Sequence, residues 1–136
     1  MRHRDLVVLV LIFCLALMFL LPASSQPSPS ELLTIALNCS SNYCALLEGS
    51  PQTAGMRSGL VRLAPGKTCG WHSTGQHEEA LVILHGQGQA RIKGKASHSL
   101  VAPMLTYIPP ATEHNVENTG TGWLEYVYVV APVQKE

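Results

Sequence analysis

The chain has 136 residues, and its nine Lys and Arg residues balance nine Asp and Glu residues, so the formal net charge at pH 7 is zero. A neutral chain without a basic patch argues against nucleic acid and anionic membrane surfaces as partners, because both are recognised through clustered positive charge. The length predicts one small domain with one hydrophobic core.

The N-terminal segment is typical of a secretory signal peptide. After the basic start MRHRD, an uncharged apolar run extends from Leu6 to Leu21, and PASSQ follows with Ala23 and Ser25 spaced for cleavage. Cleavage would remove residues 1–25 and leave a secreted or periplasmic protein whose mature domain does not bind a membrane. Because a short apolar run can still span a locally thinned bilayer, an uncleaved N-terminal membrane anchor is the alternative.

Residues 26–45 are expected to form a short N-terminal extension. The residues QPSPS at its start are typical of a stiff, polar linker. Ser28, with Glu31 three positions later, matches the N-cap of a short helix that would end near Leu37. The sequence therefore predicts a helical extension ahead of the folded domain.

Three cysteines follow the predicted cleavage site. In an exported protein, Cys39 and Cys44 can form a disulfide that closes the small loop NCSSNYC and leaves Cys69 as a free thiol. Since spacing alone does not determine disulfide geometry, three buried and inert thiols are the alternative.

From Met56 onward, short apolar segments alternate with turns rich in Gly and Pro. The predicted strands are MRSGLVRL, CGWHST, EEALVIL, QARI, SLV, LTYI, HNV and WLEYVYVV. The predicted turns between them include APGK, GQG, KGK, PPATE and NTGTG. Many short strands at close spacing predict an all-β barrel or sandwich, which we place at residues 46–136.

One predicted strand directs a carboxylate toward the core. Side chains alternate across a strand, so Glu79 shares a face with Leu81 and Ile83 and is buried if they are. A buried carboxylate must be paired, hydrogen-bonded or bound to metal, because an isolated buried charge is costly. Glu78 has the opposite parity and is expected in solvent.

Histidines lie near both ends of this part of the chain. His72 precedes the strand, and His114 opens the strand that follows the PPATE turn. His77 lies in the turn before Glu79, where it can fold inward as a further metal ligand or face solvent at the barrel mouth. Cys69 is three residues before His72, which predicts opposite faces and argues against a Cys-His nucleophile.

The segment from Gly66 to Asn118 resembles the cupin superfamily. The first cupin motif, G-x5-H-x-H-x3,4-E-x6-G, fits at Gly66, His72, Glu79 and Gly86. The second, G-x5-P-x-G-x2-H-x3-N, fits at Pro109, His114 and Asn118. The resemblance implies a single-domain cupin β-barrel, which is a double-stranded β-helix or jelly roll. It also implies a homodimer that pairs edge strands.

Three positions depart from these motifs. Pro103 and Ala111 replace the two glycines of the second motif, and both changes concern turns. Thr74 stands where the second histidine of the first motif belongs, and this change concerns the metal ligands. In metal-binding cupins, the ligands are the histidines and glutamate of the first motif and the histidine of the second, so His72, Glu79 and His114 remain.

The resemblance implies a divalent metal held by two histidines and one carboxylate. Fe, Mn, Ni and Zn all accept such ligands, and positions would stay open for substrate. One implied function is a metal-dependent dioxygenase, isomerase or lyase for a small organic molecule, with Glu78 or His77 as candidate proton-transfer groups. One alternative is a non-catalytic barrel that binds a small ligand or a sugar, either with a metal or without one. The other is a barrel that only associates with a protein partner. The motifs alone decide neither the substrate nor whether the protein is an enzyme.

Overall fold

The computed structural model describes residues 32–133, and this part of the chain is built from β-strands. The strands are β1 (Tyr43–Glu48), β2 (Arg57–Leu63), β3 (His72–Ser73), β4 (His77–His85), β5 (Gln87–Ile92), β6 (His98–Val101), β7 (Met104–Ile108), β8 (Glu113–Glu117) and β9 (Leu124–Pro132). The described residues contain no helix. The predicted all-β fold is therefore confirmed.

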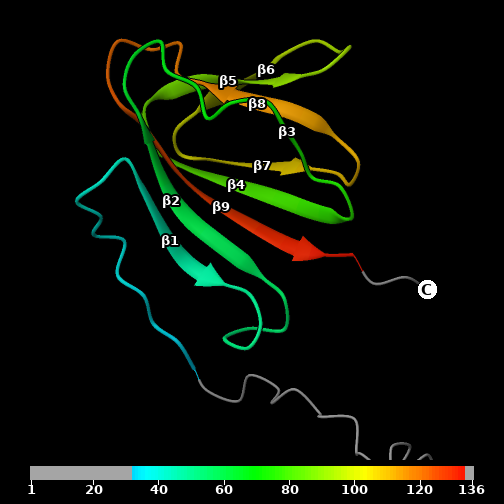
Figure 1. Cartoon of the computed structure of the whole chain (residues 1–136). Helices are drawn as coiled ribbons and strands as arrows, with labels where there is room; N and C mark the ends of the chain where they lie inside the picture. The colour runs from blue at the N-terminus through cyan, green and yellow to red at the C-terminus, as the bar shows by residue number, and fades with distance from the viewer. Residues whose placement is uncertain (1–31, 134–136) are drawn as a thin grey trace, which may run out of the picture.

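The strands form two antiparallel sheets that lie face to face (Figure 1). One sheet has the order β1-β2-β9-β4-β7, and the other has the order β3-β8-β5-β6. Because β9 pairs with both β2 and β4, the C-terminal strand lies at the centre of the larger sheet. Consecutive segments therefore pass between the sheets, which brings side chains from distant parts of the sequence into one interior.

The core lies between the two sheets and follows the alternation of the sequence. In β4, Glu79, Leu81 and Ile83 are buried while their neighbours are more exposed, as the predicted inward face requires. The cluster of buried apolar residues consists of Val61, Leu63, Leu81, Ile83, Ala90, Leu100, Ile108, Val116, Leu124 and Tyr126. Glu79 thus sits on the inner face of the larger sheet, at the end of the row of core side chains.

Two features of the N-terminal part differ from the prediction. The helix expected to end near Leu37 is absent from residues 32–39, where apolar side chains such as Leu32 and Leu33 are exposed. A short helix is marginal in water without an apolar surface to pack against, and these residues have none. Strand β1 was missed because YCALLE does not alternate clearly, and it begins at Tyr43, inside the predicted extension.

The segments assigned to the signal peptide and to the Ser28 cap lie outside the described residues. Within residues 32–133, no helix is long and apolar enough to cross a membrane.

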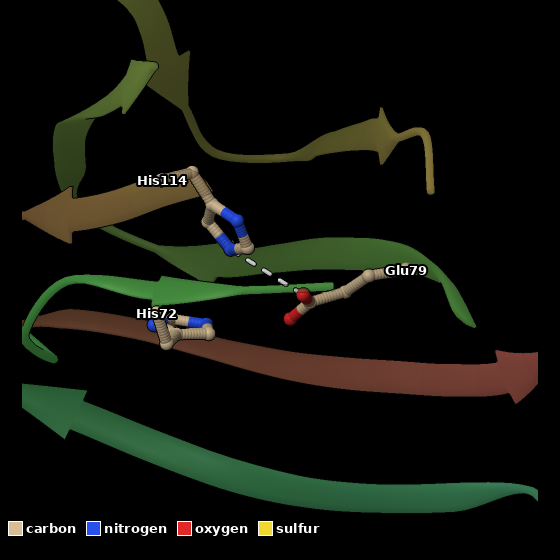
Figure 2. A group of neighbouring side chains, drawn as sticks. All are labelled: His72, Glu79 and His114. Atoms are coloured by element: carbon tan, nitrogen blue, oxygen red, sulfur yellow. Dashed lines mark ion pairs between the residues drawn. The ribbon is translucent and has the colours of Figure 1, made fainter. Parts of the chain in front are cut away.

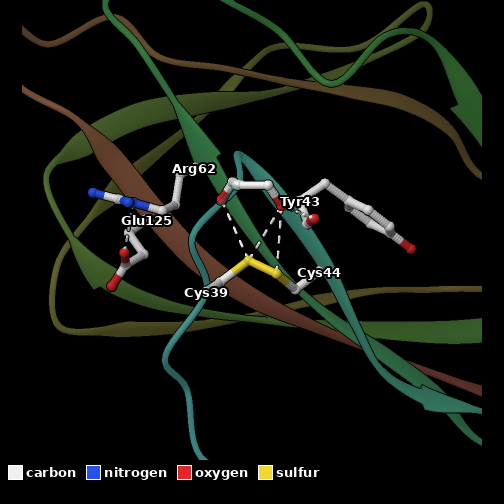
Figure 3. Close-up of a disulfide and its surroundings, with 6 residues drawn as sticks. Cys39, Tyr43, Cys44, Arg62 and Glu125 are labelled. Atoms are coloured by element: carbon white, nitrogen blue, oxygen red, sulfur yellow. Dashed lines mark hydrogen bonds and ion pairs between the residues drawn. A yellow bond between two sulfur atoms is a disulfide. The ribbon is translucent and has the colours of Figure 1, made fainter.

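Cys39 and Cys44 form a disulfide at the start of β1, with their Cα atoms 6.1 Å apart (Figure 3). The loop it closes is fastened to the sheet, because the Arg62 amide donates a hydrogen bond to the Asn42 carbonyl at 2.8 Å. The structure therefore contains the predicted disulfide and not three separate thiols, and Cys69 is a free cysteine.

Candidate metal centre

Three ligand-type side chains meet between the sheets, from three different strands. His72 on β3 and His114 on β8 are direct cross-strand partners, and their ring centroids lie 4.2 Å apart. Glu79 reaches them from β4 of the opposite sheet, and its Oε2 atom lies 3.3 Å from His114 Nε2 (Figure 2). One potential ligand atom from each residue lies within 4.8 Å of the other two. The structure thus brings together the three residues that the motifs select.

The proton positions on both histidines are set by backbone carbonyls. His114 Nδ1 lies 3.2 Å from the Thr112 carbonyl, and His72 Nδ1 lies 2.9 Å from the Gly70 carbonyl. A carbonyl only accepts, so each Nδ1 is the donor and each neutral ring keeps its lone pair on Nε2. Metal-binding histidines commonly donate their other ring N–H to a backbone carbonyl in this way.

The His114 Nε2 atom is the strongest sign that the group fits a metal. His114 is 0% exposed, Glu79 is 6% exposed, and within residues 32–133 Nε2 has no hydrogen-bond partner even though the carboxylate is close. A buried polar atom without a partner costs free energy, and a cation between the imidazoles and the carboxylate would satisfy it. Two imidazoles that present Nε2 and a carboxylate fit a divalent metal, which would displace a proton from His72, and several metals accept such ligands.

Thr74, which replaces the second histidine of the first motif, has a different role. Its buried hydroxyl donates to the Pro109 carbonyl and accepts from the Thr112 amide, each at 2.9 Å. The hydroxyl thus bonds both the Pro109 carbonyl and the Thr112 amide of the turn before β8. Thr74 therefore fixes that turn and does not serve as a ligand. The Thr112 carbonyl in the same turn orients the His114 ring.

The two candidate proton-transfer residues lie in different places. His77 is the first residue of β4 and lines the same cavity as the three ligand-type residues, but it is not part of their close group. Glu78 is exposed, and its Oε2 accepts a hydrogen bond from the Tyr107 hydroxyl at 3.3 Å. Alternation along β4 directs Glu78 away from Glu79, so it does not line the cavity.

Cys69 corrects a sequence-based expectation, because it lies beside His72 rather than on the opposite face. Both residues line one cavity. The prediction assumed a continuous strand, but Gly70 has a φ of 89° and β3 contains only His72 and Ser73, so alternation does not apply. The Val116 amide also donates to Cys69 Sγ at 3.2 Å, which holds the thiol at the cavity wall.

This pair alters the ionisation of both partners. Hydrogen bonding with Cys69 raises the pKa of His72 to about 9, against the opposing effect of burial. Burial disfavours the Cys69 thiolate, but hydrogen bonds with His72 and the Val116 amide outweigh it and lower the thiol pKa. Burial also raises the pKa of Tyr126, so its hydroxyl stays protonated near neutral pH.

The group opens into a cavity of about 1200 Å³ on the inner face of the larger sheet. The walls include apolar side chains such as Val61 and Val130, together with the tyrosines Tyr126 and Tyr128. A cavity of this size accommodates a small organic molecule beside the three ligand-type residues. Sequence reasoning did not assign Tyr128 to this site, because its role depends on pairing between strands far apart in the chain.

Comparisons with known proteins agree with this architecture. Residues 59–130 match the model of the family described as Cupin domain. The cupin domain of Schizosaccharomyces pombe Cnp3 has a TM-score of 0.60 at 14% identity, and the match covers 67% of this chain and 64% of that one. No relative was found among curated proteins.

Two further solved structures are covered more completely. A cupin 2 conserved barrel domain protein from Salinispora arenicola has a TM-score of 0.60 at 19% identity, over 74% of this chain and 89% of that one. A predicted oxalate decarboxylase from Thermotoga maritima has a TM-score of 0.53 at 19% identity, over 68% and 93%. At such identities the likeness shows a shared fold.

Proposed function

The chain belongs to the cupin domain family, and on that premise we propose that it is a metal-dependent enzyme acting on a small organic molecule. The observation that carries the proposal is the buried His114 Nε2, which faces Glu79 without a hydrogen-bond partner among the described residues. His72, Glu79 and His114 would hold one divalent metal. When bound, the metal would polarise a substrate oxygen, which suits a dioxygenase, an isomerase or a lyase.

The chain's own residues would bind and orient the substrate beside this site. The carbonyls of Gly70 and Thr112 keep both rings in place before any ligand arrives. The protonated Tyr126 hydroxyl offers a hydrogen bond from the cavity wall. His77 is the candidate for moving a proton, because it lines the cavity whereas Glu78 does not.

Metal content tests the site directly. The chain is expressed at full length, purified, exposed to Fe, Mn, Ni or Zn and measured by elemental analysis. We expect one metal per chain in the wild type, loss of that metal in His114→Ala, and full retention in His98→Ala, which alters an exposed histidine on β6. Wild-type protein that takes up no metal, or His114→Ala that keeps it, would contradict the proposal.

A second candidate function is a non-catalytic cupin that holds a small ligand or a sugar. The observation that favours it is the position of Glu78, which removes one of the two candidate proton-transfer groups from the cavity. To distinguish the two functions, the metal-loaded protein is incubated with a small organic molecule or a sugar that it binds, and the molecule is recovered and analysed. A ligand recovered chemically unchanged supports binding alone, and a converted ligand supports the enzyme.

We also propose that the protein is exported, either secreted or periplasmic, or held at the membrane by an uncleaved N-terminal segment. The signal-like residues 1–25 and the Cys39–Cys44 disulfide support export, because disulfides persist in oxidising compartments. Fractionation of cells that produce the chain, with the N-terminus of each pool sequenced, distinguishes a cleaved from an anchored form.

A homodimer is the proposed assembly. Strand β7 forms one edge of the larger sheet, and Leu105 and Tyr107 on it are exposed. An edge strand with exposed apolar side chains favours pairing with another copy. Light scattering coupled to gel filtration should give twice the chain mass, and a mass equal to one chain would contradict the dimer.

A further inference from the structure

An arginine lies in the same row of the larger sheet as Glu79. The registers of the strand pairs align Glu79 on β4 with Val130 on β9, and Val130 with Arg57 on β2. Glu79 and Arg57 both line the cavity, and one strand separates theirs. Two strand spacings place their backbones about 10 Å apart. A molecule that touches the metal centre can therefore extend along the sheet toward Arg57.

The Arg57 guanidinium forms no ion pair within the described part of the chain. Among residues 32–133, the arginines that form ion pairs are Arg62 with Glu125 and Arg91 with Glu117, and Arg57 forms none. Its cross-strand neighbour Glu48 lines the same cavity without an ion pair to it. The guanidinium, which carries five donors, is left to meet a ligand.

Gly59, two residues after Arg57 on β2, leaves room for the Tyr128 ring. The Tyr128 ring lies over Gly59, where an added Cβ would be 2.6 Å from the ring. The Tyr128 hydroxyl lies 2.7 Å from the Tyr43 hydroxyl, so the ring is held toward β1. One proton is used within this hydroxyl pair, and the other can be donated to a ligand oxygen near Arg57.

With a metal bound, the charges that line the cavity favour an anion. Arg62 on the wall is paired with Glu125, so the remaining cations, Arg57 and Lys67, balance the carboxylates of Glu48 and Glu79. A divalent metal at the three ligand-type residues would add two positive charges to this wall. An anionic molecule is attracted by such a cavity, whereas a cationic molecule is repelled.

We propose that the cavity binds a small linear organic acid, with one oxygen-bearing end at His72, Glu79 and His114 and a carboxylate at Arg57. The inference deepens the proposed function, because the first end rests on the metal centre. The second end rests on Arg57 and the hydroxyl pair. A planar guanidinium matches a carboxylate through two parallel hydrogen bonds, which gives both affinity and orientation.

The test compares linear dicarboxylates from malonate to suberate with the monocarboxylate of equal chain length. Binding to the full-length chain is measured by calorimetry, with Mn²⁺ and without metal. In the Mn²⁺-loaded wild type we expect one dicarboxylate to bind at least about tenfold tighter than its monocarboxylate, as one charge-assisted contact of about 1.4 kcal/mol or more implies. Arg57→Gln should reduce this preference to about threefold or less.

Matched variants separate the role of Arg57 from general effects. Arg91→Gln makes the same charge change on β5, away from the cavity lining, and should keep the preference. Arg57→Lys keeps the charge but not the planar fork, so it should keep part of the preference. Circular dichroism verifies that each variant is folded. If Arg57→Gln does not fold, Arg57→Lys serves as the test, and a preference equal to that of the wild type would then contradict the proposal.

The outcomes for the metal and for the acid are distinguishable. A preference that is absent in the wild type, or that survives unchanged in Arg57→Gln, would overturn the organic-acid proposal even if one Mn²⁺ binds per chain. If Mn²⁺ does not bind but dicarboxylates still bind in an Arg57-dependent way, the carboxylate site stands and the proposed metal function fails.

Discussion

Thr74 shows how one residue can remove a ligand and still serve the metal centre. Its hydroxyl joins β3 to the 109–112 turn through hydrogen bonds with the Pro109 carbonyl and the Thr112 amide. The Thr112 carbonyl in turn accepts from His114 Nδ1. An additional histidine at position 74 would lose this turn contact, so the residue present here orients one ligand in place of being one.

Replacing Thr74 by valine should therefore weaken both the fold and the metal site. Thr74→Val keeps the shape but leaves the partly buried Thr112 amide without its partner, so the free energy of unfolding should fall by about 1–3 kcal/mol. Metal affinity should fall about 10- to 100-fold, because the His114 support is loosened. Urea unfolding and metal titration measure the two effects. Thr74→Ser, which retains the hydroxyl, should preserve both, and equal loss in the two variants would refute the role of the hydroxyl.

The Cys69 thiol should be unusually reactive in metal-free protein. Its pKa is lowered beside His72, whose own pKa is raised to about 9, so His72 is charged at pH 7 and a larger fraction of Cys69 is thiolate. We expect iodoacetamide to modify the Cys69 peptide faster at pH 7 than in His72→Gln. In that variant the rate should rise only at higher pH, toward the ordinary thiol pKa. Mass spectrometry of the peptide follows the reaction, and identical pH profiles in the two proteins would contradict the pairing.

At the scale of elements, the turn between β7 and β8 stores backbone strain. Ala111 has a φ of 53°, in the left-handed region that favours glycine, and the cupin motif has glycine at this position. Its amide donates to the Gly75 carbonyl at 2.8 Å, which keeps the turn against the loop before β4. The substitution is therefore less neutral than its place in a turn suggests.

Ala111→Gly should stabilise the protein. Relief of the left-handed strain gains about 1–2 kcal/mol, and the greater entropy of glycine in the unfolded chain offsets about half, so a net gain of about 0.5–1 kcal/mol is expected. Chemical denaturation at constant m-value measures it. As a control, Ala96→Gly in the exposed turn after β5 has no positive φ to relieve and should not stabilise. A destabilised Ala111→Gly protein would show that this turn carries no strain.

The elements differ in how well the sequence predicts them, and the reason is local regularity. The apolar run of β4 gives the strand to within one residue at each end, although His77 was expected in the turn, and the alternation with Leu81 and Ile83 gives the inward direction of Glu79. The β1 strand does not alternate, and its pairing with β2 depends on a long-range contact. The placement of Cys69 failed for a related reason, because the positive φ of Gly70 breaks the strand that parity assumes.

Some residues of the candidate site could be predicted from local sequence, and others could not. His72, Glu79 and His114 occupy motif positions, so their spacing along the chain suggested them before any contact was known. Arg57 and Tyr128 belong to no motif, and they reach the cavity only through the registers of β2 and β9. A cavity wall made by strand pairing is a property of the folded sheet, which local patterns do not contain.

At the scale of the whole molecule, a metal at this site would join the two sheets. His72 and His114 belong to the four-stranded sheet, and Glu79 belongs to the five-stranded sheet. The direct interaction between them is a buried carboxylate and an imidazole at 3.3 Å. A buried pair of this kind is weak support for stability, since desolvation opposes the attraction. A bound cation would replace it with bonds that must break when the sheets separate.

Metal should therefore raise the global stability, and Glu79 should be required for the rise. With free metal at about 100 times its dissociation constant, the free energy of unfolding should increase by about 2.7 kcal/mol, because the unfolded chain lacks the assembled site. In Glu79→Gln, which keeps the size of the side chain but not its charge, the increase should largely disappear. The metal-free stability of this variant should change little, since the uncharged amide avoids the desolvation cost of the carboxylate. Thermal and urea unfolding with and without Mn²⁺ measure these differences, with His98→Ala as the histidine control. Equal stabilisation of wild type and Glu79→Gln would mean that the metal binds elsewhere and does not link the sheets.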